Sequence, residues 1–287
     1  MTASVVPAVV GVLGGGRMGA GIAHAFCLAG SSVVVVERDA ASAEAALDRV
    51  RGSLAASIER GTTDQTLDAL LARVSVGHDD AAFSEAGLVI EAVFEDTDLK
   101  RQALKRIEAR MRPDAWLASN TSSISITALA GSLERPERFC GLHFFNPVPG
   151  SRLVEIVVGK RTADELTGLA REWVAGLGKT PVVVQDAPGF ASSRLGLALG
   201  LEAIRMVEEG VASPEDIDAA MVLGYQHPIG PLKLTDIVGL DVRLGIAEYL
   251  HSRLGERFEP PALLRAMVER GDLGRKSGQG FYAWPSN

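Results

Sequence analysis

The sequence has little cysteine and no long apolar run. Its 287 residues include two cysteines, Cys27 and Cys140, which are too few for a disulfide framework or a cysteine-rich zinc site. Both lie in apolar runs, so we expect buried small side chains, a reducing cytoplasmic compartment and no bound metal. No apolar run approaches the roughly 18 residues of a membrane span, so we expect no membrane partner. A strand-like run begins at Ala8, and we expect no signal or transit peptide ahead of it.

Positive charge is also in deficit. The 29 lysines and arginines face 36 aspartates and glutamates, which gives a formal net charge of −7 at pH 7. Phosphate contacts dominate the affinity of proteins for nucleic acid, so this balance argues against a nucleic-acid partner. It still allows a local basic patch for a phosphorylated small molecule. Hydrophobic residues make up 47% of the chain, as is typical of a globular protein, and the length suggests about two domains.

Short β-branched runs alternate with helical patterns as far as about residue 185. Continuous apolar runs of this kind are typical of parallel strands that are covered on both faces, and their alternation with helices predicts an α/β sheet. Between about residues 45 and 73 two helical patterns follow each other without a strand, and we interpret them as a helix-turn-helix insertion. The expected strands are 9–13, 32–37, 87–92, 115–119, 138–144, 153–158 and 180–185.

Helix signals replace strand signals near Pro188. Ser213 followed by Pro214 and two acids is a complete helix start. Gly230 precedes another helical pattern, for which Thr235 and Asp236 are candidate caps. We therefore predict a Rossmann-like doubly wound domain over residues 1–186. An all-helical domain follows over residues 187–287.

A glycine-rich turn follows the first strand. Gly14, Gly16 and Gly19 match the pattern G-x-G-x-x-G between an apolar strand and an alanine-rich helix. In that setting the glycines permit a tight turn, approach of the backbone to a pyrophosphate and close packing of the helix. Glu37 ends the next strand and is the expected acceptor for ribose hydroxyls, which favours NAD over NADP. Arg38 beside it is able to accommodate a 2′-phosphate and leaves that alternative open.

A histidine and a glutamate stand on two consecutive strand candidates. His143 ends the first and Glu155 lies within the second. A carboxylate beside an imidazole fixes its tautomer and stabilises the imidazolium, as a general base requires. The alternative is an ordinary buried core histidine. Upstream, residues 119–123 read Ser-Asn-Thr-Ser-Ser after an apolar strand. They are able to bind a cofactor and a substrate oxygen, or to form only a turn or helix cap.

Several longer motifs occur in a fixed order along nearly the whole chain. With them the sequence resembles the bacterial 3-hydroxyacyl-CoA dehydrogenases of the 3-hydroxybutyryl-CoA dehydrogenase type. The motifs are GGGRMGAGIA (14–23), EAVFE (91–95), SNTSS (119–123), GLHFFNPV (141–148), LVEI (153–156), PGF (188–190), GPL (230–232) and GQGFY (278–282).

The resemblance implies NAD-dependent, reversible oxidation of an (S)-3-hydroxyacyl-CoA to the 3-oxoacyl-CoA by a homodimer. It also implies that the helical domain over residues 187–287 serves substrate binding and dimerisation. His143 matches the family's general base, Glu155 its partner and Ser122 the serine that binds the substrate oxygen. Ser53 and Arg60 fall where the family contacts coenzyme A, although a solvated helix face is the alternative reading of both. Further matches to the cofactor site are Met18, Glu95, Lys100, Ser122, Asn146 and Lys276.

One position departs from the family pattern. After Pro-Gly-Phe the family usually has an asparagine that reaches the substrate, and Ser193 takes its place here. Serine is shorter and offers one donor rather than two. The departure leaves open a dehydrogenase for 3-hydroxyadipyl-CoA, for a carrier-bound acyl group or for a hydroxy acid without coenzyme A. A non-catalytic NAD(H)-binding protein is a further alternative.

Overall fold

The computed structural model describes residues 5–285 and divides into two compact units. The first unit ends at Asp186 and the second begins at Ala187. Each unit has its own buried core, and each is described separately below. Among the described residues, both cysteines are buried and free, and no helix is long and apolar enough to cross a membrane.

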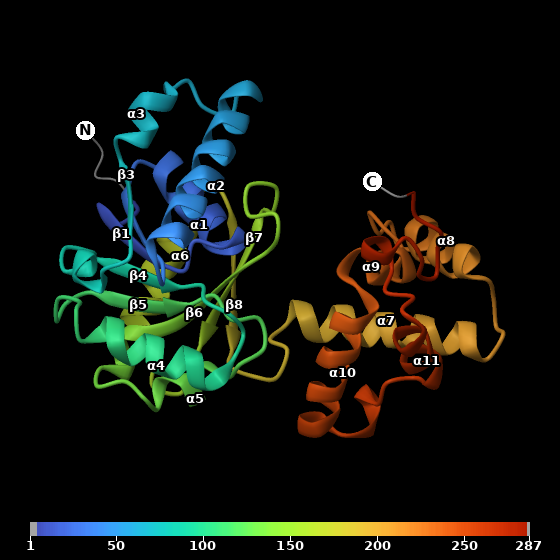
Figure 1. Cartoon of the computed structure of the whole chain (residues 1–287). Coiled ribbons are helices and arrows are strands. Elements are labelled where there is room, and N and C mark those ends of the chain that lie inside the picture. Colours follow the sequence, from blue (N-terminus) through green and yellow to red (C-terminus); the bar gives the residue numbers. More distant parts are fainter. Residues whose placement is uncertain (1–4, 286–287) are drawn as a thin grey trace. The chain divides into compact units, whose positions relative to one another are not determined.

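The first unit is built on one eight-stranded sheet (Figure 1). Its strands lie in the order β3-β2-β1-β4-β5-β6-β7-β8, and all neighbours pair in parallel except β6 and β7. This arrangement confirms the predicted Rossmann-like α/β fold. The strands are β1 (Val9–Leu13), β2 (Ser32–Val36), β3 (Val74–Gly77), β4 (Leu88–Glu91), β5 (Trp116–Ser119), β6 (Phe139–Phe144), β7 (Leu153–Val158) and β8 (Thr180–Gln185).

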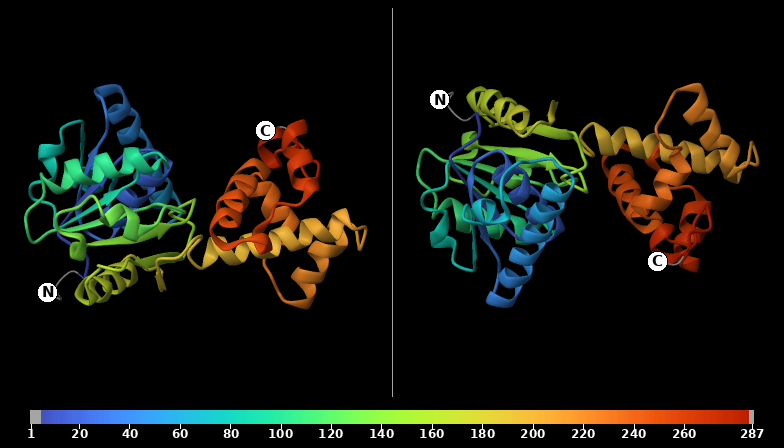
Figure 2. Two further views of the ribbon diagram at one scale, coloured as in Figure 1. Left: turned by 90° about the horizontal axis from the view of Figure 1, so that it is seen from below. Right: turned by 90° about the horizontal axis from the view of Figure 1, so that it is seen from above.

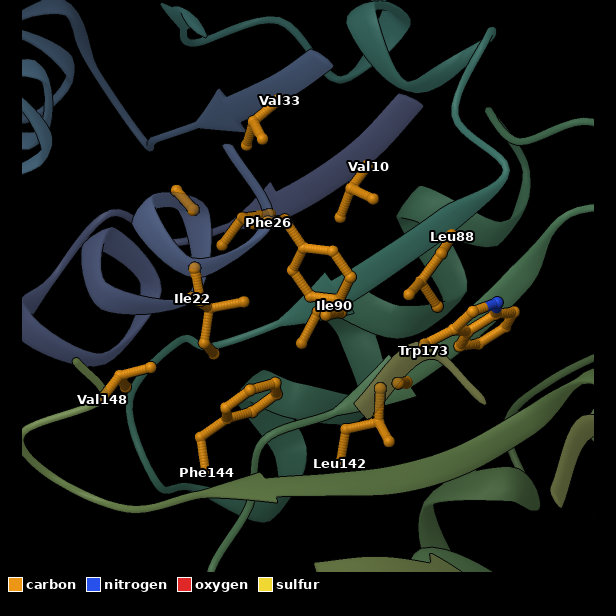
Figure 3. Packing of buried hydrophobic residues seen from close by; sticks show 14 of the residues in the cluster. Val10, Ile22, Phe26, Val33, Leu88, Ile90, Leu142, Phe144, Val148 and Trp173 are labelled. Atoms are coloured by element: carbon orange, nitrogen blue, oxygen red, sulfur yellow. The ribbon is translucent and has the colours of Figure 1, made fainter. Parts of the chain in front are cut away.

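Helices cover both faces of this sheet. One face is covered by α1 (Arg17–Leu28), α2 (Ala40–Glu59) and α6 (Asp164–Gly176), whose apolar side chains share one core cluster with the strands. Figure 3 shows Phe26 of α1 and Trp173 of α6 in this cluster, with Ile90 of β4. The other face carries α4 (Thr97–Glu108) and α5 (Ile126–Ala130). Shorter elements are α3 (Leu67–Leu71) and the 3₁₀ turns Asp80–Phe83 and Pro136–Arg138.

The expected helix-turn-helix insertion is present, but its limits differ from the prediction. Helix α2 already begins at Ala40, because the Asp39 carboxylate caps it by accepting the Ser42 N–H at 2.7 Å. Gly61 follows α2 with a φ of 66°, where the chain turns towards α3. A four-residue strand, β3, then pairs with β2 at the sheet edge. The sequence prediction missed it, because a strand so short leaves almost no periodicity to detect.

The second unit is helical (Figure 2). Its longest helix, α7, contacts all four of the other helices and presents apolar residues to their shared core. Within the described residues this unit has only isolated β-bridges, at Gly274, Gln279 and Ala283, and no strand. The helices are α7 (Ser192–Glu208), α8 (Pro214–Gly224), α9 (Pro231–Val238), α10 (Leu240–Leu254) and α11 (Ala262–Arg270), with 3₁₀ turns at Glu256–Phe258 and Arg275–Ser277.

The caps in this unit follow the sequence in one case and contradict it in another. Ser213 caps α8 as predicted, with its hydroxyl accepting the Asp216 N–H at 3.1 Å. The prediction that Thr235 and Asp236 are caps is wrong, because α9 already begins at Pro231 and both residues lie inside it. The carboxylate of Asp218 instead accepts the N–H groups at the start of α9.

Candidate active site

The glycine-rich turn lies where the strand order of the sheet reverses. Strand β1 has β2 on one side and β4 on the other, which is where open α/β sheets form a ligand crevice. Gly14 has a φ of 91°, and a Cβ there would stand 2.8 Å from the Ala92 carbonyl oxygen. A Cβ on Gly19 would stand 1.7 Å from the Gly14 carbonyl oxygen, so only glycine lets α1 approach so closely.

The turn fits a dinucleotide. Helix α1 begins after Gly16 with no side-chain cap, which leaves its first N–H groups and positive dipole end for a phosphate. A Cβ on Gly16 would have no heavy atom within 4 Å, so backbone approach is open there. Glu37 lies beside the turn and accepts the Gly15 N–H at 2.7 Å through Oε1. A carboxylate has further lone pairs for ribose hydroxyls.

His143 and Glu155 lie opposite each other on antiparallel strands. The register of β6 and β7 pairs the two residues directly, and Nδ1 of His143 lies 2.8 Å from Oε2 of Glu155. Both are buried, with exposures of 6% and 1%. The imidazole also packs against Phe145, with ring centroids 4.3 Å apart and the ring planes tilted by 46°. A carboxylate at this distance accepts a hydrogen bond from a proton on Nδ1 and therefore favours that tautomer.

A buried ion pair stands next to this dyad. The Lys100 ammonium of α4 lies 2.6 Å from Oε1 of Glu91, at the end of β4, and 3.3 Å from Oε2 of Glu95. Lys100 is 1% exposed and Glu91 is fully buried. Glu91 also accepts the Ser119 hydroxyl at 2.6 Å. The charges are therefore held by fixed partners rather than by solvent.

The polar run after β5 is organised by one carboxylate. Oε1 of Glu95 accepts the Thr121 hydroxyl at 2.5 Å, the Ser122 N–H at 3.0 Å and the Ser123 hydroxyl at 3.0 Å. Burial raises the pKa of the Glu95 carboxyl. The Lys100 ammonium and these hydrogen bonds together lower it by more, so the net pKa lies below its usual value. Glu95 is therefore ionised, and Ser122 stays exposed beside it.

These groups converge on one cavity of about 340 Å³ in the first unit. The carboxyl ends of β4, β5 and β6 supply its walls, because parallel strands end at the same edge of a sheet. Glu155 supports His143 from behind. The lining residues are Met18, Ala92, Val93, Glu95, Lys100, Asn120, Ser122, His143, Phe144, Phe145 and Asn146.

A second, larger hollow of about 860 Å³ lies between α1, α2 and the loop 146–150. It contains Ser53 and Arg60, the two residues expected to contact coenzyme A, together with Arg17 and Arg49. Asn146 borders both this hollow and the smaller cavity. The two hollows therefore share a border at Asn146.

Two of the predicted site residues belong to the second unit. Lys276 follows α11, and its ammonium lies 2.6 Å from Oδ2 of Asp241 at the start of α10. Burial raises the pKa of Asp241, but the hydrogen bond and charge of Lys276, together with backbone hydrogen bonds from Val242 and Asp241, lower it more, so the net pKa lies below its usual value. Ser193 lies in the first turn of α7. The first unit therefore supplies the cavity and the dyad, and the roles of Ser193 and Lys276 stay predictions.

Sequence reasoning did not single out three residues of the site. Glu91 anchors Lys100, and its signal was a carboxylate at the end of an apolar strand. Asn120 lines the cavity and accepts the Phe144 N–H at 2.9 Å, which ties β5 to the end of β6. Arg49 of α2 lines the larger hollow, and its hydrogen bond from Nη1 to the Gly15 carbonyl at 3.2 Å has no signal in the sequence.

Comparison with protein families gives two matches that together span most of the chain. Residues 9–187 match the profile described as 3-hydroxyacyl-CoA dehydrogenase, NAD binding domain. Residues 189–284 match the profile described as 3-hydroxyacyl-CoA dehydrogenase, C-terminal domain.

Individual relatives are similar over the same length. A probable 3-hydroxybutyryl-CoA dehydrogenase of Deinococcus radiodurans is 44% identical over 279 residues, which cover 96% of this chain and 99% of that protein. A 3-hydroxyadipyl-CoA dehydrogenase of Escherichia coli is 39% identical over 278 residues. The matched region covers 96% of this chain and 58% of that protein. The crystal structure of an (S)-3-hydroxybutyryl-CoA dehydrogenase from Ralstonia eutropha superimposes on this chain with a TM-score of 0.93 at 40% identity. The superposition covers 98% of this chain and 100% of the Ralstonia chain.

Proposed function

The chain belongs to the 3-hydroxyacyl-CoA dehydrogenase family, and we propose that it oxidises an (S)-3-hydroxyacyl-CoA reversibly to the 3-oxoacyl-CoA with NAD. The observation that carries this proposal is the buried dyad of His143 and Glu155, held at 2.8 Å beside a cavity next to the glycine-rich turn. 3-Hydroxybutyryl-CoA is the substrate that the similar proteins' names favour.

His143 is the proposed general base. Bound NAD supplies the hydride acceptor for the substrate's C3. Nε2 of His143 takes the proton of the 3-hydroxyl as the carbonyl forms, and in the reverse direction returns it. Glu155 holds Nδ1–H and stabilises the imidazolium, so the positive charge is paired while the proton resides on the ring. Phe145 packs on the ring and limits its rotation.

The polar wall of the cavity is proposed to position the substrate oxygen and the nicotinamide half of the cofactor. Ser122 is exposed to the cavity and is the proposed donor to the oxygen at C3. Glu95, Lys100, Asn146 and Met18 line the same space. Lys100 lies between the Glu91 and Glu95 carboxylates, so both charged groups of the wall, Glu95 and Lys100, are held by ion pairs. Lys276 of the second unit is proposed to join this half of the cofactor site.

The basic hollow is the proposed site for coenzyme A. Ser53 and Arg60 line it, and arginine meets phosphate oxygens with paired donors. Ser193 is proposed to contact the acyl group, as its position in the motif implies. Glu37 is proposed to bind the adenosine ribose hydroxyls, which disfavours a 2′-phosphate and makes NAD rather than NADP the cofactor.

The proposed assembly is a cytoplasmic homodimer formed through the second unit. Large apolar side chains are exposed on that unit, with Leu223 at 80% and Tyr225 at 76%. Light scattering at micromolar concentration is expected to give twice the chain mass of 30.2 kDa. A monomer mass would reject the dimer.

The catalytic proposal is tested by NADH oxidation with acetoacetyl-CoA. We expect rapid turnover by the unchanged protein, and its loss in His143→Ala while NADH binding persists. Glu155→Gln is expected to lower kcat by about 100-fold or more, since the imidazolium loses its counter-charge. Bound NADH without turnover on acetoacetyl-CoA, or on longer, dicarboxylic and carrier-bound 3-oxoacyl thioesters, would refute the proposed activity.

A further inference from the structure

Two charged side chains, those of Glu37 and Arg49, form hydrogen bonds with the backbone N–H and carbonyl of Gly15 in the glycine-rich turn. The Gly15 N–H donates to Oε1 of Glu37 at 2.7 Å, and the Gly15 carbonyl accepts from Nη1 of Arg49 at 3.2 Å. Gly15 lies between the two glycines that begin the cofactor motif. The orientation of its peptide groups therefore depends on the end of β2 and, independently, on helix α2.

Helix α2 also rests directly on this residue. A Cβ on Gly15 would stand 2.3 Å from the Ala46 side chain, so the helix and the turn are in van der Waals contact. Ala46 and Arg49 are three residues apart and share one face of α2. A ligand that fixes this part of α2 therefore fixes Gly15 as well.

Arg49 faces the basic hollow at the same time. It lines the hollow with Arg17 and Arg60, against one acidic residue, Asp48. Its side chain is exposed, and apart from the bond to Gly15 its guanidinium donates to no other described residue. A guanidinium has five N–H donors in a planar fork, so it is able to hold a carbonyl oxygen and a phosphate together.

We propose that Arg49 is a positioning residue that couples the two ligand sites of the first unit. One amino group holds the Gly15 carbonyl in the cofactor turn, and the remaining donors bind a phosphate of coenzyme A. Coenzyme A thereby orders Arg49 and the turn together, and each ligand raises the affinity for the other. This inference rests on the proposed function, which places the two ligands in these two sites.

The test measures NADH binding with and without free coenzyme A. Free coenzyme A carries the phosphates and no acyl group, so the assay is independent of turnover. In the unchanged protein, saturating coenzyme A is expected to lower the Kd of NADH by about fivefold. By linkage, NADH lowers the Kd of coenzyme A by the same factor. In Arg49→Met the ratio of the NADH Kd without coenzyme A to the NADH Kd with coenzyme A is expected to fall to about 1.

Arg51→Met is the matched control, since Arg51 lies on the same helix, is exposed and does not line the hollow. It removes the same charge and is expected to keep the fivefold effect of coenzyme A on the Kd of NADH. If Arg49→Met does not fold, Arg49→Gln retains an amide donor for Gly15 and is expected to bind NADH but lose the coupling.

The outcomes separate this inference from the proposed function. If both ligands bind but neither changes the affinity for the other, the coupling is refuted and the dehydrogenase proposal stands. Coupling that survives in Arg49→Met, or that disappears equally in Arg51→Met, refutes the role of Arg49. If coenzyme A and acetoacetyl-CoA fail to bind at millimolar concentration, the acyl-CoA proposal itself is wrong.

Discussion

The buried His24 of α1 predicts an acid-sensitive first unit. Its side chain is 3% exposed, Nε2 lies 2.8 Å from the Ser57 hydroxyl, and Nδ1 has no hydrogen-bond partner among the described residues. Burial, followed by the positive charges of Arg60 and Lys179, lowers the pKa of His24 from 6.5 to about 4. The folded protein therefore holds this imidazole neutral at pH values where the unfolded chain protonates it.

The sign and size of the effect follow from proton linkage. Between pH 6.5 and pH 4 the unfolded state binds one more proton at His24 than the folded state, so the stability falls as the pH falls. At about 1.4 kcal/mol for each pKa unit, the loss reaches about 2 kcal/mol between pH 8 and pH 5. It approaches about 3 kcal/mol below pH 4.

The prediction is tested by comparing the protein with His24→Gln. Glutamine keeps a polar group for Ser57 and does not titrate. Urea unfolding between pH 8 and pH 5 is followed by hydrogen exchange in peptides from α1, so that only the first unit is read. The free energy of unfolding should fall by about 2 kcal/mol more in the unchanged protein than in the variant. Parallel pH profiles would show that His24 titrates normally and that this reasoning is wrong.

Three further variants test other parts of the site. Lys100→Met leaves the buried Glu91 carboxylate without its ion-pair partner and should lower the free energy of unfolding by about 3–5 kcal/mol. Lys105 is exposed on the same helix, and Lys105→Met should change the free energy of unfolding little. Glu37→Ser should raise the kcat/KM for NADPH relative to NADH by about tenfold, since a repulsion of about 1.4 kcal/mol disappears; an unchanged ratio would mean that Glu37 does not face the 2′ position. Ser193→Asn should change the ratio of kcat/KM between acyl chains by roughly ten- to a hundredfold and leave the KM for NADH unchanged. Equal effects on all acyl chains would remove Ser193 from the acyl site.

The pairing of the dyad shows how far the sequence reached. Two strands and a short loop made contact between His143 and Glu155 feasible, but a shift of one residue would have sent the two side chains to opposite faces. The register that places them opposite each other is a property of β6 and β7 within the sheet. Similarly, the polar run at 119–123 was open to several readings until Glu95 was seen to bind three of its residues.

Helix α4 shows a limit of pattern reading. Lys100 lies in a strongly polar segment, and sequence reasoning offers no way to distinguish a buried lysine there from a solvated one. Its burial depends on the Glu91 carboxylate at the end of β4, which lies on a different element. The edge strand β3 was missed for a related reason, since its four residues become a strand only by pairing with β2.

The sequence by itself determined the glycine turn, the alternation of strands and helices, the change to a helical second unit and the order of the family motifs. These features are local, because backbone freedom at glycine and the spacing of apolar residues act between near neighbours in the chain. Only the tertiary structure decided that Glu91 meets Lys100, that Glu95 gathers residues 121–123 and that Arg49 reaches Gly15. Strand order and helix packing bring these partners together from distant segments. Buried charges are stable only where such partners meet them, so the chemistry of the site depends on contacts that no short stretch of sequence encodes.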